Sequence, residues 1–354
     1  MRTPTNRGPV RSPGTRGLAW LDSIGYSGGL TVTNQAADEV ARPHRGPHMP
    51  KVALEGSFCA TITPFNADGS VDYGGFRTWI DFHHEHGTSA LLLMGSTGEV
   101  SLLTPDERRS IIRETVKFRR PGMPLYYGCT GNSTESTIEM VRYAGAEGAD
   151  GAIITIPSYI CPPVEDAVAY YLEVAEASPI PIGIYNNPTR VKTDLPAEAV
   201  LRLAEHENVV ILKESTSRVA QIAQVLAGDP DMAVMCCDSP NLGLVMPVMS
   251  LGGQGTANMT GNIAPAELAV ISKPWESFAD AEACRETYLR LLPLVFFTYS
   301  AVNPIPVKSL ARALGMPAGD LRRPYRALSA EALEPGLRAV RELGLAGRYG
   351  YTLP

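Results

Sequence analysis

One lysine of the 354-residue chain follows an apolar run and could act as a nucleophile. Lys213 stands in 209-VVILKES, directly after four aliphatic residues. Burial among apolar groups disfavours a charged ammonium, and a neutral amine can attack a carbonyl carbon to form a Schiff base. The alternative is a structural lysine paired with the adjacent Glu214. Neighbouring residues of a strand face opposite sides, which argues against that pairing.

Two tyrosines and a glycine-rich segment could assist such chemistry. Tyr185 ends the apolar run 181-PIGIY, and Tyr159 follows the run 151-GAIITIPS. A phenol donates and accepts hydrogen bonds, so it can relay protons, although most buried tyrosines are structural. In 95-GSTGE, Gly95, Ser96 and Thr97 offer two hydroxyls and a main chain that an anion can approach. Many phosphate loops share this last pattern, so it is not specific alone.

These residues lie at the ends of regularly spaced apolar runs. Eight runs are typical of strands: 58-FCATITPF, 90-ALLLMGS, 124-PLYYGCT, 151-GAIITIPSY, 181-PIGIYNNP, 209-VVILKES, 232-MAVMCCD and 252-GGQGTANMT. Segments with helical periodicity separate them, such as 104-TPDERRSIIRETVKF, in which Thr104 and Glu107 predict a capping box. Runs without strict alternation indicate parallel strands that are buried on both faces. The sequence therefore predicts an α/β fold, a (β/α)₈ TIM barrel with additional C-terminal helices.

The barrel is predicted over residues 51–280, and a C-terminal helical region over residues 281–354. Residues 1–50 hold six arginines, no lysine and little hydrophobic periodicity, so we expect a disordered N-terminal extension. A translation start at Met49 and an organelle transit peptide are the alternatives. Acidic residues such as Asp38 and Glu39 argue against a transit peptide.

Active sites of such barrels lie at the C-terminal ends of the strands. This rule selects candidates by position alone: Thr63, Ser96, Thr97, Thr130, Tyr159, Tyr185, Lys213, Asp238 and Asn258.

The composition limits the classes of function. The net charge of −6 argues against nucleic acid as a partner, and no apolar run is long enough to span a membrane. The six cysteines show no C-x-x-C pair, and several stand in apolar runs, where a free thiol behaves as a small hydrophobe. We therefore expect a cytoplasmic protein.

Several motifs together resemble one known family. From about Gly56 to Leu328, 63-TPF, 95-GSTGE, 156-IPSY, 185-YNNPTR, 212-LKES, 252-GGQG and 303-NPIPVK occur in the order and spacing of the pyruvate-dependent class I aldolases. This family includes dihydrodipicolinate synthase and N-acetylneuraminate lyase. The resemblance implies a Schiff-base enzyme that needs no cofactor and no metal, acts on pyruvate and an aldehyde, and is a dimer or a dimer of dimers.

The resemblance also implies roles for individual residues. Lys213 matches the Schiff-base lysine, and Tyr185 the general acid and base. Thr97, with the backbone around Gly95, matches the group that binds the pyruvate carboxylate. Ser96 takes the place of the hydroxyl that links Tyr185 to a second tyrosine, which reaches across a dimer interface and corresponds to Tyr159. Asn258, at the end of the eighth run, is a further candidate substrate contact.

Arg190 favours the synthase branch of the family. It matches the arginine that binds the carboxylate of aspartate semialdehyde, a geometry that suits a guanidinium group. Ser96, Ser158 and Cys237 depart from the usual synthase pattern. A sugar-acid lyase or a 2-keto-3-deoxy-acid aldolase is the alternative within the family.

The positions that match a lysine-inhibition site of some synthases differ here. This chain has Ser158, Ser136 and Arg108 where those enzymes carry a tyrosine, a glutamate and a histidine, whereas Asn132 is kept. The resemblance therefore implies weak or absent inhibition by lysine.

Two functions of other classes fit these residues less well. A metal-dependent hydrolase would need His, Asp or Glu ligands at strand ends, but the run 83-HHEH is expected on a solvated helix face. A catalytically silent barrel would not need Lys213 and Tyr185 together.

Overall fold

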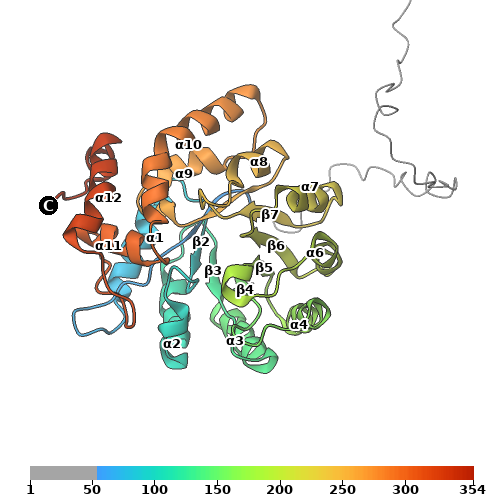
Figure 1. Ribbon diagram of the computed structural model, residues 1–354. Helices are drawn as coiled ribbons and strands as arrows, with labels where there is room; N and C mark the ends of the chain where they lie inside the picture. Colours follow the sequence, from blue (N-terminus) through green and yellow to red (C-terminus); the bar gives the residue numbers. More distant parts are fainter. Residues whose placement is uncertain (1–53) are drawn as a thin grey trace, which may run out of the picture. The chain divides into compact units, whose positions relative to one another are not determined.

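The computed structural model describes residues 54–354, and the extension predicted over residues 1–50 lies outside this part. Eight parallel strands close into a barrel in sequence order, with β1 next to β8. Figure 1 shows the strands at the centre and the helices around them. The strands are β1 (Gly56–Ala60), β2 (Ala90–Leu93), β3 (Leu125–Gly128), β4 (Gly151–Ile154), β5 (Ile182–Asn186), β6 (Val209–Glu214), β7 (Ala233–Cys236) and β8 (Gly255–Asn258). The predicted TIM barrel is confirmed. Seven strands lie within their predicted runs, and β1 begins two residues before its run, which was expected to start at Phe58.

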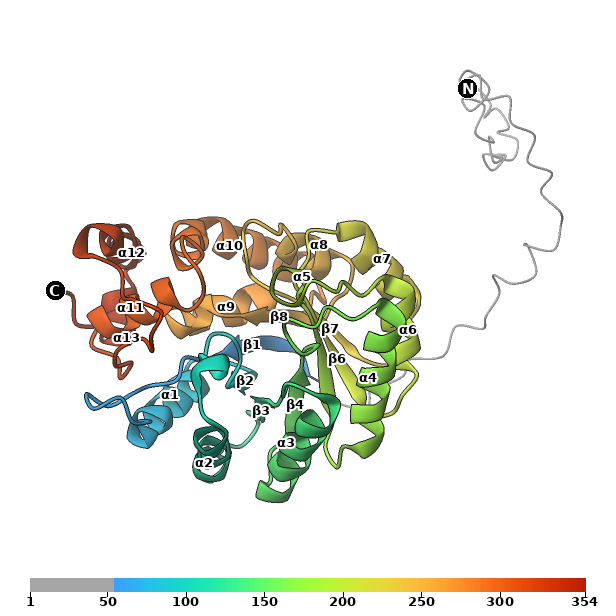
Figure 2. The same cartoon turned by 60° about the horizontal axis from the view of Figure 1, so that its bottom comes forward.

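The helices alternate with the strands and then continue beyond them (Figure 2). Those around the barrel are α1 (Tyr73–Glu85), α2 (Pro105–Thr115), α3 (Thr134–Glu147), α4 (Val164–Ala177), α5 (Pro188–Val191), α6 (Ala197–Ala204), α7 (Val219–Ala227), α8 (Val245–Ser250) and α9 (Pro265–Ser272). The C-terminal helices are α10 (Phe278–Thr298), α11 (Ile305–Ala313), α12 (Ala330–Glu342) and α13 (Leu345–Tyr349). Short 3₁₀ turns are η3 (Val100–Leu102), η4 (Val116–Phe118) and η5 (Thr260–Asn262).

Local sequence explains where these helices begin. The predicted capping box of α2 is present: the Thr104 hydroxyl accepts from the Glu107 N–H, and the Glu107 carboxylate accepts from the Thr104 N–H. In α1, Phe76, Trp79 and Ile80 recur at helical spacing and are fully buried against the strands. The apolar stripe of α1 thus covers part of the outer face of the barrel.

A second apolar cluster fills the inside of the barrel. It contains one or more side chains from most strands, among them Phe58, Leu92, Tyr126, Ile153 and Ile211. The rings of Phe58 and Tyr126 meet edge to face, with their centroids 5.3 Å apart. This packing fills the barrel interior below the carboxyl ends of the strands, so a ligand can enter only near those carboxyl ends.

Candidate active site

The alternation of side chains along β6 determines that the Lys213 side chain points into the barrel. The pairing of β5 with β6 shifts by one residue, from Ile182 opposite Val209 to Gly183 opposite Ile211. This bulge leaves Ile211 and Lys213 facing inward. Lys213 is only 4% exposed, so its amine lies in a largely dry interior.

Tyr185 is the direct neighbour of Lys213 on the adjacent strand. The two residues are register partners of β5 and β6, and residues that pair in a sheet project to the same side. The Lys213 Nζ atom lies 4.3 Å from the centre of the Tyr185 ring. Gly183, on the same strand as Tyr185, lets Ile153 pack closely, since an added Cβ would lie 2.5 Å from Ile153 Cδ1.

The Tyr185 hydroxyl is arranged to keep its proton. Burial raises the pKa of Tyr185 far above its usual value, and the nearby Cys237 thiol adds to the effect. The hydroxyl oxygen accepts a hydrogen bond of 2.7 Å from Asn187 Nδ2. Tyr185 is therefore neutral at physiological pH, with an O–H group that can be donated to a substrate oxygen.

Glu214, the residue after Lys213, lies on the opposite face of β6. Its carboxylate faces outward and accepts from Asn186 Nδ2 at 3.1 Å, from Gln221 Nε2 at 3.3 Å and from the Ser215 N–H at 2.8 Å. Burial raises the pKa of Glu214, and these hydrogen bonds oppose the effect. The expected separation of Lys213 from Glu214 is thus confirmed.

The segment 95-GSTGE forms the loop after β2, and the C-terminal region holds it in place. Asn303, between α10 and α11, donates from Nδ2 to Thr97 Oγ1 at 3.0 Å and to Ser96 Oγ at 3.4 Å. Lys308 in α11 donates to the Glu99 carboxylate at 2.6 Å, and this ion pair is almost completely buried. Burial lowers the pKa of Lys308 to about 8, against the attraction of Glu99.

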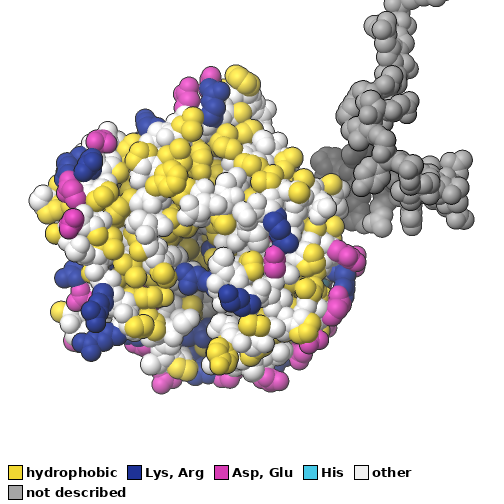
Figure 3. Space-filling model, viewed as in Figure 1, with side chains coloured by type: hydrophobic (Ala, Val, Ile, Leu, Met, Phe, Trp, Pro, Cys, Tyr) yellow, Lys and Arg dark blue, Asp and Glu magenta, His cyan; other side chains and the backbone are white. Residues whose placement is uncertain are grey.

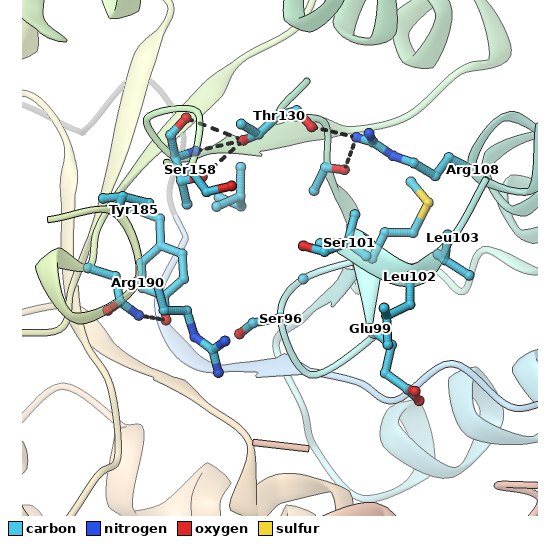
Figure 4. A pocket seen from close by; sticks show the side chains of 18 of the residues that line it. Ser96, Glu99, Ser101, Leu102, Leu103, Arg108, Thr130, Ser158, Tyr185 and Arg190 are labelled. Carbon is cyan, nitrogen blue, oxygen red and sulfur yellow. Dashed lines mark hydrogen bonds between the residues drawn. The ribbon is translucent and has the colours of Figure 1, made fainter. Parts of the chain in front are cut away.

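A cavity of about 710 Å³ lies at the strand ends. Gly95, Ser96, Tyr185 and Arg190 are among the residues that line it, whereas Lys213 and Thr97 lie beside these residues and do not line it. Figure 3 shows a hollow on this face with Lys and Arg side chains at its edge. In Figure 4 the side chains of Ser158, Tyr185 and Arg190 lie on one side of the cavity and Arg108 lies on the opposite side, with Ser96 between them. Arg190 reaches over the loop and donates to the Asn303 carbonyl at 3.3 Å. Arg108 donates to the carbonyl oxygens of Gly128 and Thr130.

Comparison with known proteins identifies the family. Residues 53–342 match the model of the dihydrodipicolinate synthetase family. The chain belongs to the dihydrodipicolinate synthetase family. It is 36% identical over 297 residues to a 4-hydroxy-tetrahydrodipicolinate synthase of Methylibium petroleiphilum (82% of this chain, 99% of that protein). Over 293 residues it is 32% identical to that of Ralstonia nicotianae (82% and 98%).

A solved structure of the family supports the same assignment. The chloride-inhibited dihydrodipicolinate synthase of Acinetobacter baumannii, crystallised in complex with pyruvate, superposes with a TM-score of 0.77 at 30% identity (82% of this chain, 99% of that one). The predicted family and its enzyme class, a pyruvate-dependent class I aldolase, are confirmed.

The other residues that were predicted from their position at a strand end differ in whether they face the cavity. Thr130 lines the cavity. Thr63 is buried beneath the 95-GSTGE loop and donates to the Gly98 carbonyl at 2.7 Å. Asp238 is buried and accepts from the Tyr299 hydroxyl at 2.5 Å and from two main-chain N–H groups of the β8 end. Tyr159 is 97% exposed and does not line the cavity.

The structure turns the side chain of Asn258, a predicted substrate contact, away from the cavity. Alternation along β8 places Ala257 in the barrel interior, so Asn258 faces the helix layer. Its amide donates to Ser57 Oγ at 2.9 Å and to Thr256 Oγ1 at 3.0 Å, and its carbonyl accepts from the Gly261 N–H. The strand end was predicted correctly, but the phase of the strand was not known.

The hydroxyls of Ser96 and Tyr185 are not joined directly. Each bonds to an asparagine instead: Ser96 to Asn303, and Tyr185 to Asn187. Sequence reasoning gave neither asparagine a role, although Asn303 opens the 303-NPIPVK motif that helped to indicate the family. The signal that could have found them is their position within motifs shared with the family, not their residue type.

The histidine run does not form a metal site with its neighbours. His83 is fully buried, which contradicts the expected solvated face, and its Nδ1 lies 2.9 Å from Thr88 Oγ1. Among residues 54–354, no cluster of three or more His, Cys, Asp or Glu side chains could hold a metal ion. In the same part of the chain, no helix has both the length and the apolar character needed to cross a membrane.

Proposed function

We propose that the protein condenses pyruvate with aspartate semialdehyde to give 4-hydroxy-tetrahydrodipicolinate, through a Schiff base on Lys213. The observation that carries this proposal is the pairing of Lys213 with Tyr185 inside the barrel, where the amine lies 4.3 Å from the centre of the phenol ring. Membership of the family and the names of its relatives support the choice of reaction.

The chain's own residues can perform each step. The Lys213 amine adds to the keto carbon of pyruvate, and Tyr185 gives a proton to the resulting hydroxyl, which leaves as water. The iminium withdraws electrons, so the methyl group loses a proton to the Tyr185 phenolate left by that transfer, and the enamine carbon attacks the aldehyde carbon. The aldehyde oxygen takes up a proton. The amine of aspartate semialdehyde then attacks the imine carbon, which closes the ring and frees Lys213.

Two sets of groups are proposed to hold the two carboxylates. The hydroxyls of Ser96 and Thr97, with the main chain of Gly95, bind the carboxylate of pyruvate, because this loop stands directly at the end of β2. Arg190 binds the carboxylate of the aldehyde substrate. In the described part of the chain Arg190 makes no ion pair with an acidic side chain, so its charge is available to a ligand.

We propose that the active unit is a dimer or a dimer of dimers in which Tyr159 completes the site of the neighbouring subunit. Tyr159 and Ile160 are large apolar side chains that are 97% and 58% exposed at the tip of a loop near the cavity. The left-handed backbone of Tyr159 holds the ring away from its own barrel. A partner that covers this tip would bury both side chains and bring a phenol toward Ser96.

Borohydride trapping tests the central claim. Protein incubated with pyruvate and borohydride is expected to gain one reduced pyruvate adduct, which peptide mass spectrometry places on Lys213. Lys213→Ala should give no adduct, whereas Lys117→Ala, which changes an exposed lysine, should behave like the parent. An adduct on another lysine, or none in the parent, would contradict the proposal.

An aldehyde panel separates the synthase from the alternative in the same family. With pyruvate fixed, aspartate semialdehyde should be consumed far faster than sugar aldehydes such as N-acetylmannosamine or glyceraldehyde. A preference for a polyhydroxylated aldehyde would instead favour a sugar-acid lyase or a 2-keto-3-deoxy-acid aldolase.

We also propose that lysine does not inhibit the enzyme appreciably. Arg108, Asn132 and Ser158 line the cavity, and none of them carries a negative charge that could hold the amine of lysine. Ser136 caps its own helix, since its Oγ accepts from the Ser133 N–H at 3.0 Å. Inhibition of the condensation of pyruvate with aspartate semialdehyde by low-millimolar lysine would contradict this expectation.

A further inference from the structure

Asn303 ties both hydroxyls of the 95-GSTGE loop to the C-terminal region. Its Nδ2 has two hydrogens, and it donates to two oxygens, Thr97 Oγ1 at 3.0 Å and Ser96 Oγ at 3.4 Å. Both hydroxyls therefore act as acceptors toward the amide. A hydroxyl that accepts in this way has its own hydrogen left to donate to another group.

In the part of the chain that the structure describes, those hydroxyl hydrogens have no acceptor. Among residues 54–354, Asn303 is the hydrogen-bond partner of both hydroxyls, and neither hydroxyl donates to an acceptor. Thr97 is 1% exposed, so water has little access to it. Two O–H donors thus lie on one short loop beside the cavity without acceptors, which is the arrangement that a carboxylate requires.

The other end of the amide explains why the side chain adopts this orientation. Asn303 Oδ1 is buried and has no hydrogen-bond partner in the described part of the chain. If the amide were turned over, Oδ1 would accept both hydroxyl hydrogens and two N–H donors would be buried without acceptors. One unsatisfied oxygen with two lone pairs costs less than two unsatisfied N–H groups.

We infer that Asn303 is a positioning residue. Its side-chain amide orients the hydroxyls of Ser96 and Thr97 so that both donate hydrogen bonds to a bound carboxylate, which makes the site selective for a keto acid over a neutral ketone. The inference rests on the proposed function, because the carboxylate in question is that of pyruvate. The inference also gives the C-terminal region a part in substrate selection, although Asn303 and Thr97 are 206 positions apart in the sequence.

Replacing the amide by a carboxylate reverses the direction of these hydrogen bonds. In Asn303→Asp, which has the same shape, the new oxygens would accept from Ser96 and Thr97 and would repel the substrate carboxylate. The pyruvate concentration for half-maximal borohydride trapping should rise at least tenfold, while kcat at saturating pyruvate changes less than threefold. Asn303→Ala, which only releases the hydroxyls, should give a smaller rise in that concentration and retain its kcat.

Selectivity is the readout that a purely structural role would not change. The parent should trap pyruvate at far lower concentration than its neutral methyl ester, and Asn303→Asp should reduce this ratio at least fivefold. Ser300→Ala, an exposed change in the same segment, should leave both values as in the parent. Thermal midpoints of all variants establish that they are folded.

The outcomes separate this inference from the proposed function. If the parent traps pyruvate and Asn303→Asp does so at the same concentration with the same ester ratio, the inference is overturned and the Schiff-base function stands. If Asn303→Asp does not fold, an unchanged ester ratio in Asn303→Ala overturns it equally. Absence of any adduct in the parent overturns both.

Discussion

Lys213 and Glu214 show how two adjacent charged residues acquire opposite roles. Both are buried, yet Lys213 faces the interior beside the Tyr185 ring, whereas Glu214 faces outward into a set of amide and main-chain donors. Burial of a charge is costly unless other groups compensate for it. The protein compensates Glu214 with hydrogen bonds and leaves Lys213 without an acidic partner among the described residues, which suits a nucleophile.

Arg190→Ala should weaken the use of aspartate semialdehyde without affecting imine formation. Loss of a charged hydrogen-bond pair is worth about 1.5–3 kcal/mol, so kcat/KM for this substrate should fall by roughly 10- to 150-fold. Borohydride trapping of pyruvate should be unchanged. Arg202→Ala, which removes an exposed arginine that pairs with Glu165, is the matched control. An equal loss for every aldehyde would show that Arg190 has no role in recognising the carboxylate.

His83 should make the protein less stable in acid. Burial lowers the pKa of His83 to about 3 from its usual value of 6.5. Between these two pH values the unfolded chain binds a proton that the folded chain does not, so the free energy of unfolding falls as the pH decreases. The slope contributed by this residue is about 1.4 kcal/mol per pH unit below pH 6.5.

Urea unfolding at a series of pH values checks this prediction. His83→Gln should lose the slope between pH 6.5 and 4 relative to the parent, whereas His84→Gln, a change at an exposed neighbour, should retain it. Identical slopes in all three proteins would mean that His83 is protonated in the folded state.

At the residue scale, motif and position together predicted which side chains gather near the cavity better than position alone did. Ser96, Tyr185 and Arg190 line the cavity, and Lys213 lies beside Tyr185, as the family resemblance indicated. Asn258 was chosen from its position at a strand end, and it faces outward. A strand end is readable from hydrophobicity, but the side that a residue faces depends on register, which a single sequence does not contain.

At the scale of elements, the C-terminal helices are part of the active-site structure. α11 supplies Lys308, which reaches Glu99 and the Thr63 carbonyl, and the segment before it supplies Asn303. The strands and the capped helix α2 could be predicted because their patterns are local. The contact between Glu99 and Lys308 could not, since it joins residues 209 positions apart and neither residue type is unusual in its segment.

Lys308→Met should destabilise the protein severely. It would leave Glu99 charged and buried without its cation, at a cost of about 3–5 kcal/mol in the free energy of unfolding. The double variant Lys308→Met/Glu99→Gln removes both charges and should recover most of that loss. Urea denaturation measures both. A double variant no more stable than the single one would show that the ion pair itself, not the lone carboxylate, determines the effect.

At the scale of the whole molecule, the described subunit has a complete Lys213–Tyr185 pair but leaves Tyr159 in solvent. If Tyr159 serves the neighbouring subunit, two different inactive variants should restore activity when mixed. Lys213→Ala and Tyr159→Ala, unfolded and refolded together, form hybrid dimers with one intact site. Activity should return to roughly a quarter of the parent value by random pairing of subunits.

Each variant refolded alone serves as the control for this complementation. Recovery that appears only after joint refolding would establish that the site is shared between chains. No recovery, with hybrid dimers demonstrated by native mass spectrometry, would place the role of Tyr159 within its own subunit.

The single-residue bulge between β5 and β6 has a consequence for how this chain can vary in length. Val210 is the residue that the pairing skips. Were the ladder regular from Val209 onward, every later side chain of the strand would turn over, and a carboxylate rather than an amine would meet incoming substrate. Insertions or losses of one residue near this point would therefore exchange a nucleophile for an acid, even if the barrel kept its shape and stability.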